Sequence, residues 1–450
     1  MSLASSPVRS PDERDQPLMT KRAWWLVGLN LLIPGSAQLL AGSRRLGRFG
    51  VAATFVLWAL AAIGIVLWLF WRVAALTIAG SVIGLWVIAA VLVFYAALWL
   101  VLTLDTLRLV RLVKTAPGAR PLLAGVAVIA LFAVSGTAAF GAWVAANTSG
   151  FVAEVFTAGE VEPPVDGRYN FLLLGGDAGE GRDGLRPDSI TVASVDATTG
   201  EAVLIGLPRN LELVPFAAGS PMADRYPNGY GAEGCEVDVC LLNSIYTEVE
   251  LFAPELYPDA VAGGTSPGIE ATRDAVEGIT GLTIQYIVTI DMAGFEVLID
   301  ALGGVTLNVT SRVPIHADES FTTVAEWIEP GVQTLDGYHA LWFARSRHDT
   351  TDYDRMQRQR QLQQAIIEQF TPANILTKVQ SVAEAGANVV GTDIPQSMLG
   401  VLIELAAKTR ELPIGSLELT PENDVAPEFP DFPYIRELVA EATAEAEPEE

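Results

Sequence analysis

Residues 169–207 read YNFLLLGGDAGEGRDGLRPDSITVASVDATTGEAVLIGL, and this stretch decides the fold of the later part of the chain. Tyr169 to Leu174 is an apolar run that ends in glycine, as expected for a buried strand. Ser189 to Val195 and Ala202 to Leu207 are β-rich, and the turn residues 197–200 between them predict a hairpin. These three runs predict three neighbouring strands of one β-sheet.

Further along, the pattern alternates between strands and helices. Ile284 to Ile290 predicts a strand, the helical spacing of apolar residues from Phe295 to Leu302 predicts a helix that ends at Gly303-Gly304, and Val305 to Val309 predicts another strand. Strands that alternate with helices are typical of an α/β domain, so we expect a β-sheet flanked by helices.

The first third of the chain is very different in composition. Three apolar runs, 49–71, 79–104 and 121–144, are each long enough to cross a bilayer, and none carries a charge in its middle. A fourth apolar stretch, 24–40, is interrupted by Asn30, Pro34, Gly35 and Gln38, which is typical of a re-entrant hairpin. The sequence predicts an all-α transmembrane region, with 24–40 as either a hairpin or a first full span.

Basic residues predict the orientation of this region, because Lys and Arg collect in cytoplasmic loops. They lie before residue 24, at 44–48 and at 108–120. If these segments are inside, three spans leave the later part of the chain outside, whereas four full spans would leave it in the cytoplasm. The predicted division is a cytoplasmic tail (1–22), a transmembrane region (23–146), a linker (147–168), an extracytoplasmic domain (169–380), a C-terminal helical extension (381–434) and an acidic disordered tail (435–450).

Charge and cysteine content narrow the function. The net charge of −25 argues against nucleic acid as a partner. Cys235 and Cys240 are the only cysteines, with four residues between them, so a small disulfide loop in an oxidising compartment is the expectation and two free thiols the alternative.

Acidic and basic residues of the later part match the needs of a phosphate site. Asp177 follows the first predicted strand and Asp188 begins the next, so the loop between them can bring the two together as ligands of Mg²⁺, with Mn²⁺ as a substitute. Guanidinium groups pair with phosphate oxygens two at a time. The candidate pyrophosphate-binding arginines are Arg186, Arg209, Arg345, Arg347 and Arg355.

Helical spacing after Asp354 places two of these polar groups on an inward face. At about 100° per residue, Arg355 and Gln359 share a stripe with Leu362, Ile366 and Phe370, whereas Arg360 points away from it. An arginine on an apolar stripe is costly unless an acid or anion meets it. Arg345 and Arg347, two residues apart, share a side if their segment is extended.

Several motifs in order resemble the LytR-CpsA-Psr (LCP) family of cell-wall glycopolymer transferases. The resemblance runs from Tyr169 to about Phe370. It is carried by NFLLLGGD (170–177), RPDSI (186–190), LPRN (207–210), VTIDMAGF (288–295), IDALGGV (299–305), LDGYHAL (335–341) and FARSRHD (343–349), and continues through Asp352, Arg355, Arg358 and Gln359.

That resemblance implies a fold, a reaction and a set of site residues. It implies a mixed central β-sheet flanked by helices, with an apolar pocket for a polyprenyl tail. Asp177 and Asp188 would organise Mg²⁺, while Arg209, Arg345, Arg347, Arg355 and Gln359 would bind the pyrophosphate. A membrane-anchored phosphotransferase of this kind moves a glycan from a polyprenyl-pyrophosphate carrier to peptidoglycan, with Asp177, Asp188, Arg209 and Arg345 as its catalytic residues.

Three departures from the family pattern stand beside this expectation. Asn210 occupies a position where the family usually has Asp, the lysine usual before Asn243 is missing, and three spans replace the usual one. The first two argue against full activity. The rival functions are an Mg²⁺-dependent hydrolase of the same lipid and a non-catalytic lipid-binding regulator of the cell envelope.

Overall fold

The protein is described from a computed structural model, which covers residues 8–9, 11–177, 186–317, 323–346, 351–369 and 390–444. The chain divides into two compact units, Met1–Ser149 and Gly150–Glu450.

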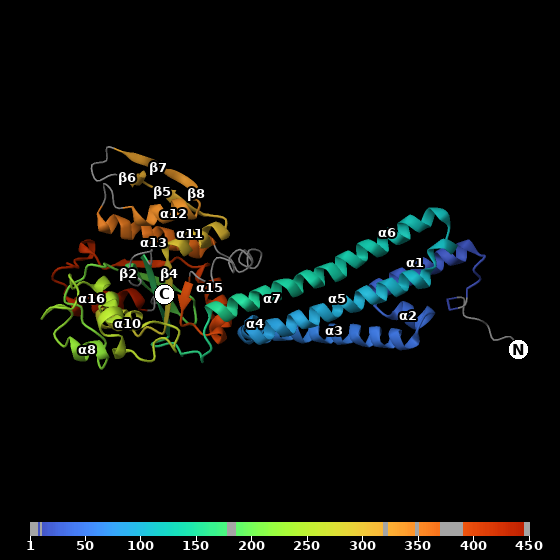
Figure 1. The fold of residues 1–450 in the computed structure, drawn as a ribbon, viewed down its shortest axis with the longest axis horizontal. Coiled ribbons are helices and arrows are strands. Elements are labelled where there is room, and N and C mark those ends of the chain that lie inside the picture. Colours follow the sequence, from blue (N-terminus) through green and yellow to red (C-terminus); the bar gives the residue numbers. More distant parts are fainter. Residues whose placement is uncertain are drawn as a thin grey trace, which may run out of the picture. The chain divides into compact units, whose positions relative to one another are not determined.

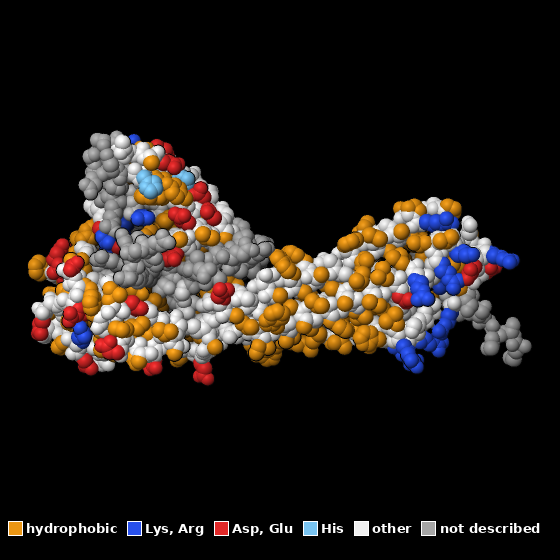
Figure 2. Space-filling view, in the orientation of Figure 1, with side chains coloured by type: hydrophobic (Ala, Val, Ile, Leu, Met, Phe, Trp, Pro, Cys, Tyr) orange, Lys and Arg blue, Asp and Glu red, His pale blue; other side chains and the backbone are white. Residues whose placement is uncertain are grey.

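The first unit is all helical, as predicted. Three helical stretches are long and apolar enough to cross a membrane, and they coincide with the three predicted spans: Arg44–Phe70, Val82–Lys114 and Pro117–Val155. Figure 2 shows hydrophobic side chains along these helices and Lys and Arg gathered at one end of the unit. Its elements are α1 (Gln16–Leu32), α2 (Ser36–Ala41), α3 (Arg44–Phe70), α4 (Arg72–Gly80), α5 (Val82–Val110), η1 (Leu112–Lys114), η2 (Pro117–Ala119), α6 (Arg120–Leu131), the π-helical turn η3 (Phe132–Gly136) and α7 (Thr137–Val155).

The interrupted stretch 24–40 forms two helices joined by a tight turn. Gly35 in that turn has φ +98°, and a Cβ added there would lie 2.6 Å from the backbone nitrogen of Val51 on α3. Only glycine therefore allows the turn and the close approach of α3. The α1–α2 pair has the helix–turn–helix shape expected of a re-entrant hairpin, whose place in a membrane stays a prediction.

The second unit is built on a mixed six-stranded sheet with the order β10-β3-β2-β1-β4-β9. Figure 1 labels β2 and β4 of this sheet. The predicted hairpin is present, because β2 pairs antiparallel with β3 and also with β1. β1 pairs with β4, and β3 with β10, in parallel. The strands are β1 (Arg168–Asp177), β2 (Arg186–Asp196), β3 (Ala202–Leu207), β4 (Tyr286–Asp291), β9 (Val390–Thr392) and β10 (Gly415–Glu418).

Both faces of this sheet are covered, which explains the nearly continuous apolar sequence of β1. Leu172 and Leu174 pack into one core with α9, α10 and α16, whereas Phe171 packs on the other face with Leu405 of α15. Alternate residues of one strand therefore serve different cores. The flanking helices are α8 (Pro221–Arg225), η4 (Leu242–Ser244), α9 (Ile245–Phe252), η5 (Pro254–Leu256), α10 (Pro267–Thr280), η6 (Gln396–Met398), α15 (Leu399–Thr409), η7 (Pro421–Asn423) and α16 (Phe432–Thr443).

A smaller layer packs beside the central sheet (Figure 1). Val305–Val309 is a strand as predicted, yet it pairs with β8 in a separate two-stranded sheet, and β6 pairs with β7 in another. Their apolar residues share a second core with Phe343 and Leu362. The elements of this layer are α11 (Met292–Ala301), β5 (Val305–Val309), β6 (Val313–Ala317), β7 (Val324–Ile328), β8 (Gly331–Leu335), α12 (Gly337–Arg345) and α13 (Asp352–Gln369).

The end of the chain differs from the prediction. The expected helical extension contains helix α15 but also contributes strands β9 and β10 to the central sheet, and the expected disordered tail begins inside helix α16. Ile435 and Val439, four residues apart on α16, are fully buried in the main core. The Ala- and Glu-rich composition concealed this short apolar stripe, and residues 445–450 lie outside the description.

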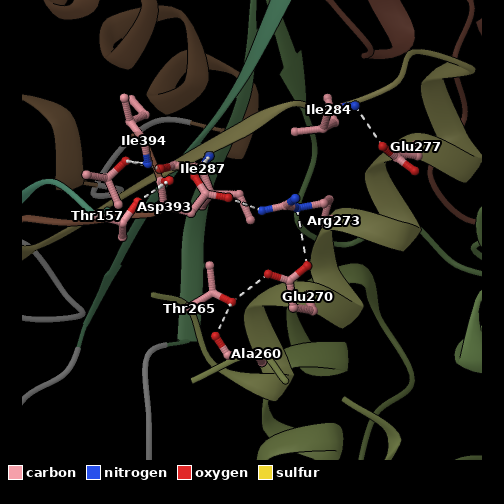
Figure 3. Close-up of polar contacts among 11 residues, drawn as sticks. Thr157, Ala260, Thr265, Glu270, Arg273, Glu277, Ile284, Ile287, Asp393 and Ile394 are labelled. Atoms are coloured by element: carbon pink, nitrogen blue, oxygen red, sulfur yellow. Dashed lines mark hydrogen bonds and ion pairs between the residues drawn. The ribbon is translucent and has the colours of Figure 1, made fainter. Parts of the chain in front are cut away.

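The predicted linker 147–168 is also more structured than expected. Helix α7 continues to Val155, and the next residues are bound to the end of β9 (Figure 3). Thr157 donates its hydroxyl to the carbonyl of Asp393 at 2.8 Å, and the Asp393 carboxylate pairs with Arg273 of α10 and accepts from the Ile287 amide at 2.7 Å. Three distant segments of the chain therefore meet at Asp393.

The two cysteines are joined, as the sequence predicted. Cys235 and Cys240 form a disulfide that closes a small loop between α8 and η4, with 5.9 Å between their Cα atoms.

Candidate active site

Asp188 lies at an irregularity in the sheet. Gly175 pairs with Ser189 and Gly176 pairs with Pro187, so Asp188 is the extra residue of a β-bulge in β2. Bulges turn a side chain away from the regular alternation of a strand. Here the carboxylate of Asp188 makes an ion pair with Arg209, which follows β3.

Arg209 is held in this position by the backbone around it. Its carbonyl accepts a hydrogen bond from the amide of Asn243 at 3.0 Å, and the amide of Leu242 donates to the Leu211 carbonyl at 2.9 Å. The short helix η4 thus fixes the loop that carries Arg209. The Nε of Arg209 also lies 3.6 Å from a carboxylate oxygen of Asp352 at the start of α13.

Arg355 joins the same cluster from α13, as the predicted stripe required. It is 2% exposed, it donates to the backbone carbonyl of Asp188 at 3.1 Å, and it pairs with Asp352 at 3.0 Å. Asp188, Arg209, Asp352 and Arg355 therefore form one contact network, which we call the bulge cluster. Sequence reasoning missed Asp352 as a site residue, although its place three residues before Arg355 on a helix puts the two side chains within reach.

Gln359 and Arg358 of α13 donate hydrogen bonds to backbone carbonyls at the end of α12. Gln359 donates to the Ala344 carbonyl at 3.2 Å, and Arg358 donates to the carbonyls of Phe343 and Ser346, so both hold the end of α12. Burial lowers the pKa of Arg358 to about 10, which still leaves it charged near neutral pH. Sequence reasoning did not foresee this role for Arg358.

Arg360 points away from the stripe, as predicted, but into a second packed surface. It lies 2.6 Å from Glu418 of β10, and burial raises the pKa of that carboxyl while Arg360 partly opposes the shift. A Cβ at Gly206 of β3 would lie 2.0 Å from a Glu418 oxygen, so only glycine leaves room for this pair.

A narrow cavity of about 10 Å³ runs beside these groups. Its lining includes Asp188, Arg209, Arg355, Gln359, Arg360 and Glu418. A space of this size admits about one water molecule.

The remaining predicted site residues are not among the contacts of the bulge cluster that the structure describes. Arg345 is the last residue of α12, is exposed, and has its guanidinium 5.4 Å from the ring of Trp342; among the described residues it makes no ion pair. The segment is helical up to Arg345, and the predicted shared side with Arg347 falls on a residue outside the described range. Asp177 and Arg186 face each other in the β1–β2 register, but their side chains, and the whole of Arg347 and Phe370, lie outside the described residues.

The sequence profile of the LytR_cpsA_psr family matches residues 146–429, more than half of the chain. The chain belongs to this family. The match covers β1 to β10 and with them the whole bulge cluster, so the motifs that carried the resemblance lie within the matched range.

Two relatives whose names state a role in the cell wall are similar to part of this LytR_cpsA_psr protein. The polyisoprenyl-teichoic acid–peptidoglycan teichoic acid transferase TagU of Oceanobacillus iheyensis is 28% identical over 243 residues, which cover 54% of this chain and 63% of TagU. The cell wall biosynthesis protein LcpA of Corynebacterium glutamicum is 28% identical over 192 residues, 40% of this chain and 36% of LcpA. The chain thus matches about a third to two thirds of the length of these relatives.

Solved structures of low identity also resemble it. TagV of B. subtilis has 22% identity and a TM-score of 0.42, over 61% of this chain and 96% of TagV. A Streptococcus agalactiae protein has 22% identity and a TM-score of 0.45, over 61% of this chain and 87% of its own.

Proposed function

We propose that this LytR_cpsA_psr protein is a membrane-anchored phosphotransferase that moves a glycopolymer from a polyprenyl-pyrophosphate carrier onto peptidoglycan. The observation that carries the proposal is the bulge cluster, in which the carboxylate of Asp188 pairs with Arg209 and its backbone carbonyl accepts from Arg355. The name of TagU, a teichoic acid transferase, supports the same class of reaction, and the name of LcpA supports a role in cell-wall biosynthesis.

Charge balance says which further residues the substrate needs. Asp188 and Asp352 offset Arg209 and Arg355, so the bulge cluster has no net charge of its own. A pyrophosphate carries negative charge and requires compensation. Arg186, Arg345 and Arg347 would supply it, and the small volume of the cavity requires that the pyrophosphate bind at its outer end.

Mg²⁺ is the metal that we propose for this site. Asp188 offers hard oxygen ligands. Asp177 lies on the neighbouring strand β1, where it pairs with Arg186, and Arg186 is two residues before Asp188 on β2. We propose these two aspartates as its ligands, with Mn²⁺ as a substitute. When bound, the metal would neutralise charge on the phosphate oxygens.

The chemistry assigned to the protein's own residues is mainly positioning and charge neutralisation. A wall hydroxyl attacks the phosphorus linked to the sugar, a new phosphodiester bond forms, and the bond to the bridging oxygen breaks. Polyprenyl phosphate leaves, and the proton of the hydroxyl passes to solvent or a carboxylate. Arg209 and Arg355 would steady the phosphate oxygens during the transfer.

An extracytoplasmic location of the second unit is part of this proposal. Three apolar helices, the basic residues at one end of their unit and the Cys235–Cys240 disulfide all support it. A cysteine-reactive, membrane-impermeant reagent applied to intact cells that carry Glu233→Cys should label the protein, whereas Ser43→Cys should react only after the cells are opened.

The activity test uses the full chain in lipid nanodiscs with labelled lipid-linked glycan and peptidoglycan. Label in the insoluble wall fraction is the expected result. Label released only as free phosphorylated glycan would replace the proposal with a hydrolase, and binding without either product would replace it with a lipid-binding regulator.

A further inference from the structure

A second cavity, of about 30 Å³, lies within the helical unit, among α1, α5, α6 and the π-helical turn η3. Its wall is mostly apolar, but it includes Asn30, Thr103, Thr106 and Ser135. Polar side chains on helices of this hydrophobicity are costly, and in membrane proteins they mark functional positions. A π-helical turn is likewise a feature that often accompanies a site.

Two oxygen atoms at this cavity are buried without a hydrogen-bonding partner in the described chain: Oδ1 of Asn30 and Oγ of Ser135. Asn30 is 8% exposed, and its amide nitrogen already donates to the Thr103 hydroxyl at 3.3 Å. Thr106 is satisfied, because its hydroxyl donates to the Leu102 carbonyl at 2.8 Å and accepts from Gln38 at 2.9 Å. The unmet need is therefore a donor for Asn30 and a partner for Ser135.

The lining restricts what can meet that need. Among the described residues that line the cavity there is no charged side chain, so a charged group would be desolvated without compensation. The volume fits about two water-sized groups, too little for a phospholipid headgroup. Leu31 borders the cavity and is 51% exposed, so a chain attached to the bound group can lie along the outer apolar surface.

We infer that this cavity binds the hydroxyl end of a neutral lipid alcohol, such as a diacylglycerol or a long-chain primary alcohol. The hydroxyl donates its proton to Oδ1 of Asn30 and accepts one from Ser135, and the hydrocarbon tail runs out past Leu31. An ester carbonyl cannot replace it, because a carbonyl has no proton to donate. This site is independent of the phosphotransferase proposal.

The test compares two photoreactive long-chain probes on the full chain in phosphatidylcholine nanodiscs, one a primary alcohol and the other its methyl ether. The alcohol should label peptides of α1, α5 and η3 about fivefold more than the ether, the value of one net hydrogen bond. Unlabelled diacylglycerol and unlabelled long-chain alcohol, added separately as competitors, distinguish the two sources.

Two variants complete the test. Asn30→Leu should reduce alcohol labelling to the level of the ether, whereas Asn147→Leu, which changes an asparagine of α7 away from the cavity, should leave it unchanged. If Asn30→Leu does not assemble, Ser135→Ala serves with the same pair of probes. Equal labelling by alcohol and ether, or labelling that no competitor reduces, would mean that the cavity holds only water and would overturn the inference.

Discussion

Asp188 owes its orientation to its place as the extra residue of β2, opposite Gly175 and Gly176 of β1. Without the bulge, the alternation of the strand would turn either Asp188 or its neighbours toward the core. The sequence pattern found Asp188 as a candidate but could not find the bulge, because a bulge shows only in the register of two paired strands.

Replacing Asp188 by Asn should lower the rate of glycopolymer transfer by about 100-fold, similar to the loss of one oriented charge-stabilising group in an enzyme. The amide keeps the shape of the side chain but removes the charge that pairs with Arg209. Initial rates in nanodiscs measure the effect. Asp238→Asn, at an exposed position in the disulfide loop, should transfer at the wild-type rate. An unchanged rate in Asp188→Asn would remove this carboxylate from the catalytic machinery.

The raised pKa of Asp274 on α10 leads us to expect that the free energy of unfolding depends on pH. Burial raises the pKa of Asp274 to about 6, although the hydroxyl of Tyr257 donates to it. The pKa of Asp274 is higher in the folded state than the unfolded value of 3.8, so protonation of this carboxyl stabilises the folded state. That stabilisation is complete below pH 3.8 and is lost as the pH rises through 6. Asp274→Asn should therefore be about 2 kcal/mol more stable than wild type at pH 8.

Chemical unfolding of the full chain in detergent at pH 5 and pH 8 measures this difference in free energy. The gain from Asp274→Asn should be larger at pH 8 than at pH 5. A gain of equal size at both values would show that packing, and not titration, explains it.

At the scale of elements, α13 is enclosed on two sides. Arg355 and Leu362 face one way, while Arg360 reaches β10 on another side, so arginines that look solvent-facing in the sequence are buried. A helical wheel identifies one inward stripe when a helix packs on one neighbour. The stripe of Arg355 and Gln359 was confirmed, whereas the burial of Arg358 and Arg360 depends on α12 and on a strand that follows much later in the chain.

Arg358 should stabilise the end of α12 more than its place in a polar helix suggests. Arg358→Met leaves the Phe343 and Ser346 carbonyls without their donor, so we expect the free energy of unfolding to fall by about 2–4 kcal/mol. Gln357→Met changes the exposed neighbour and should alter it by less than about 0.5 kcal/mol. Denaturant unfolding of both variants checks the pair, and equal effects would contradict a specific role for Arg358.

The strands of the central sheet could be predicted to different degrees. The apolar runs of β1, β2 and β3 give nearly their observed bounds, because both faces of each strand are buried and the hairpin has strong turn residues. β9 and β10 have only three and four residues, too short to show a period, and they gain their partners only from the folded sheet.

On the scale of the whole molecule, the C-terminal segment is part of the core. Deleting residues 431–450 removes α16 and the burial of Ile435 and Val439, each worth about 1.5–3 kcal/mol. We expect this truncation to lower the melting temperature of the second unit strongly, measured by the loss of near-UV circular dichroism. Deleting only residues 445–450 should leave it unchanged, and equal melting of the two truncations would contradict the packing of α16.

Strand β10 is synthesised long after β3, yet it closes one edge of the sheet against β3. Until then β3 presents unpaired backbone groups, a template on which other chains can assemble. A premature stop codon before residue 415 would therefore yield more than an inactive fragment. Such a product would carry every residue of the bulge cluster and an open strand edge, and we expect it to aggregate or to be degraded by the quality-control proteases of the cell.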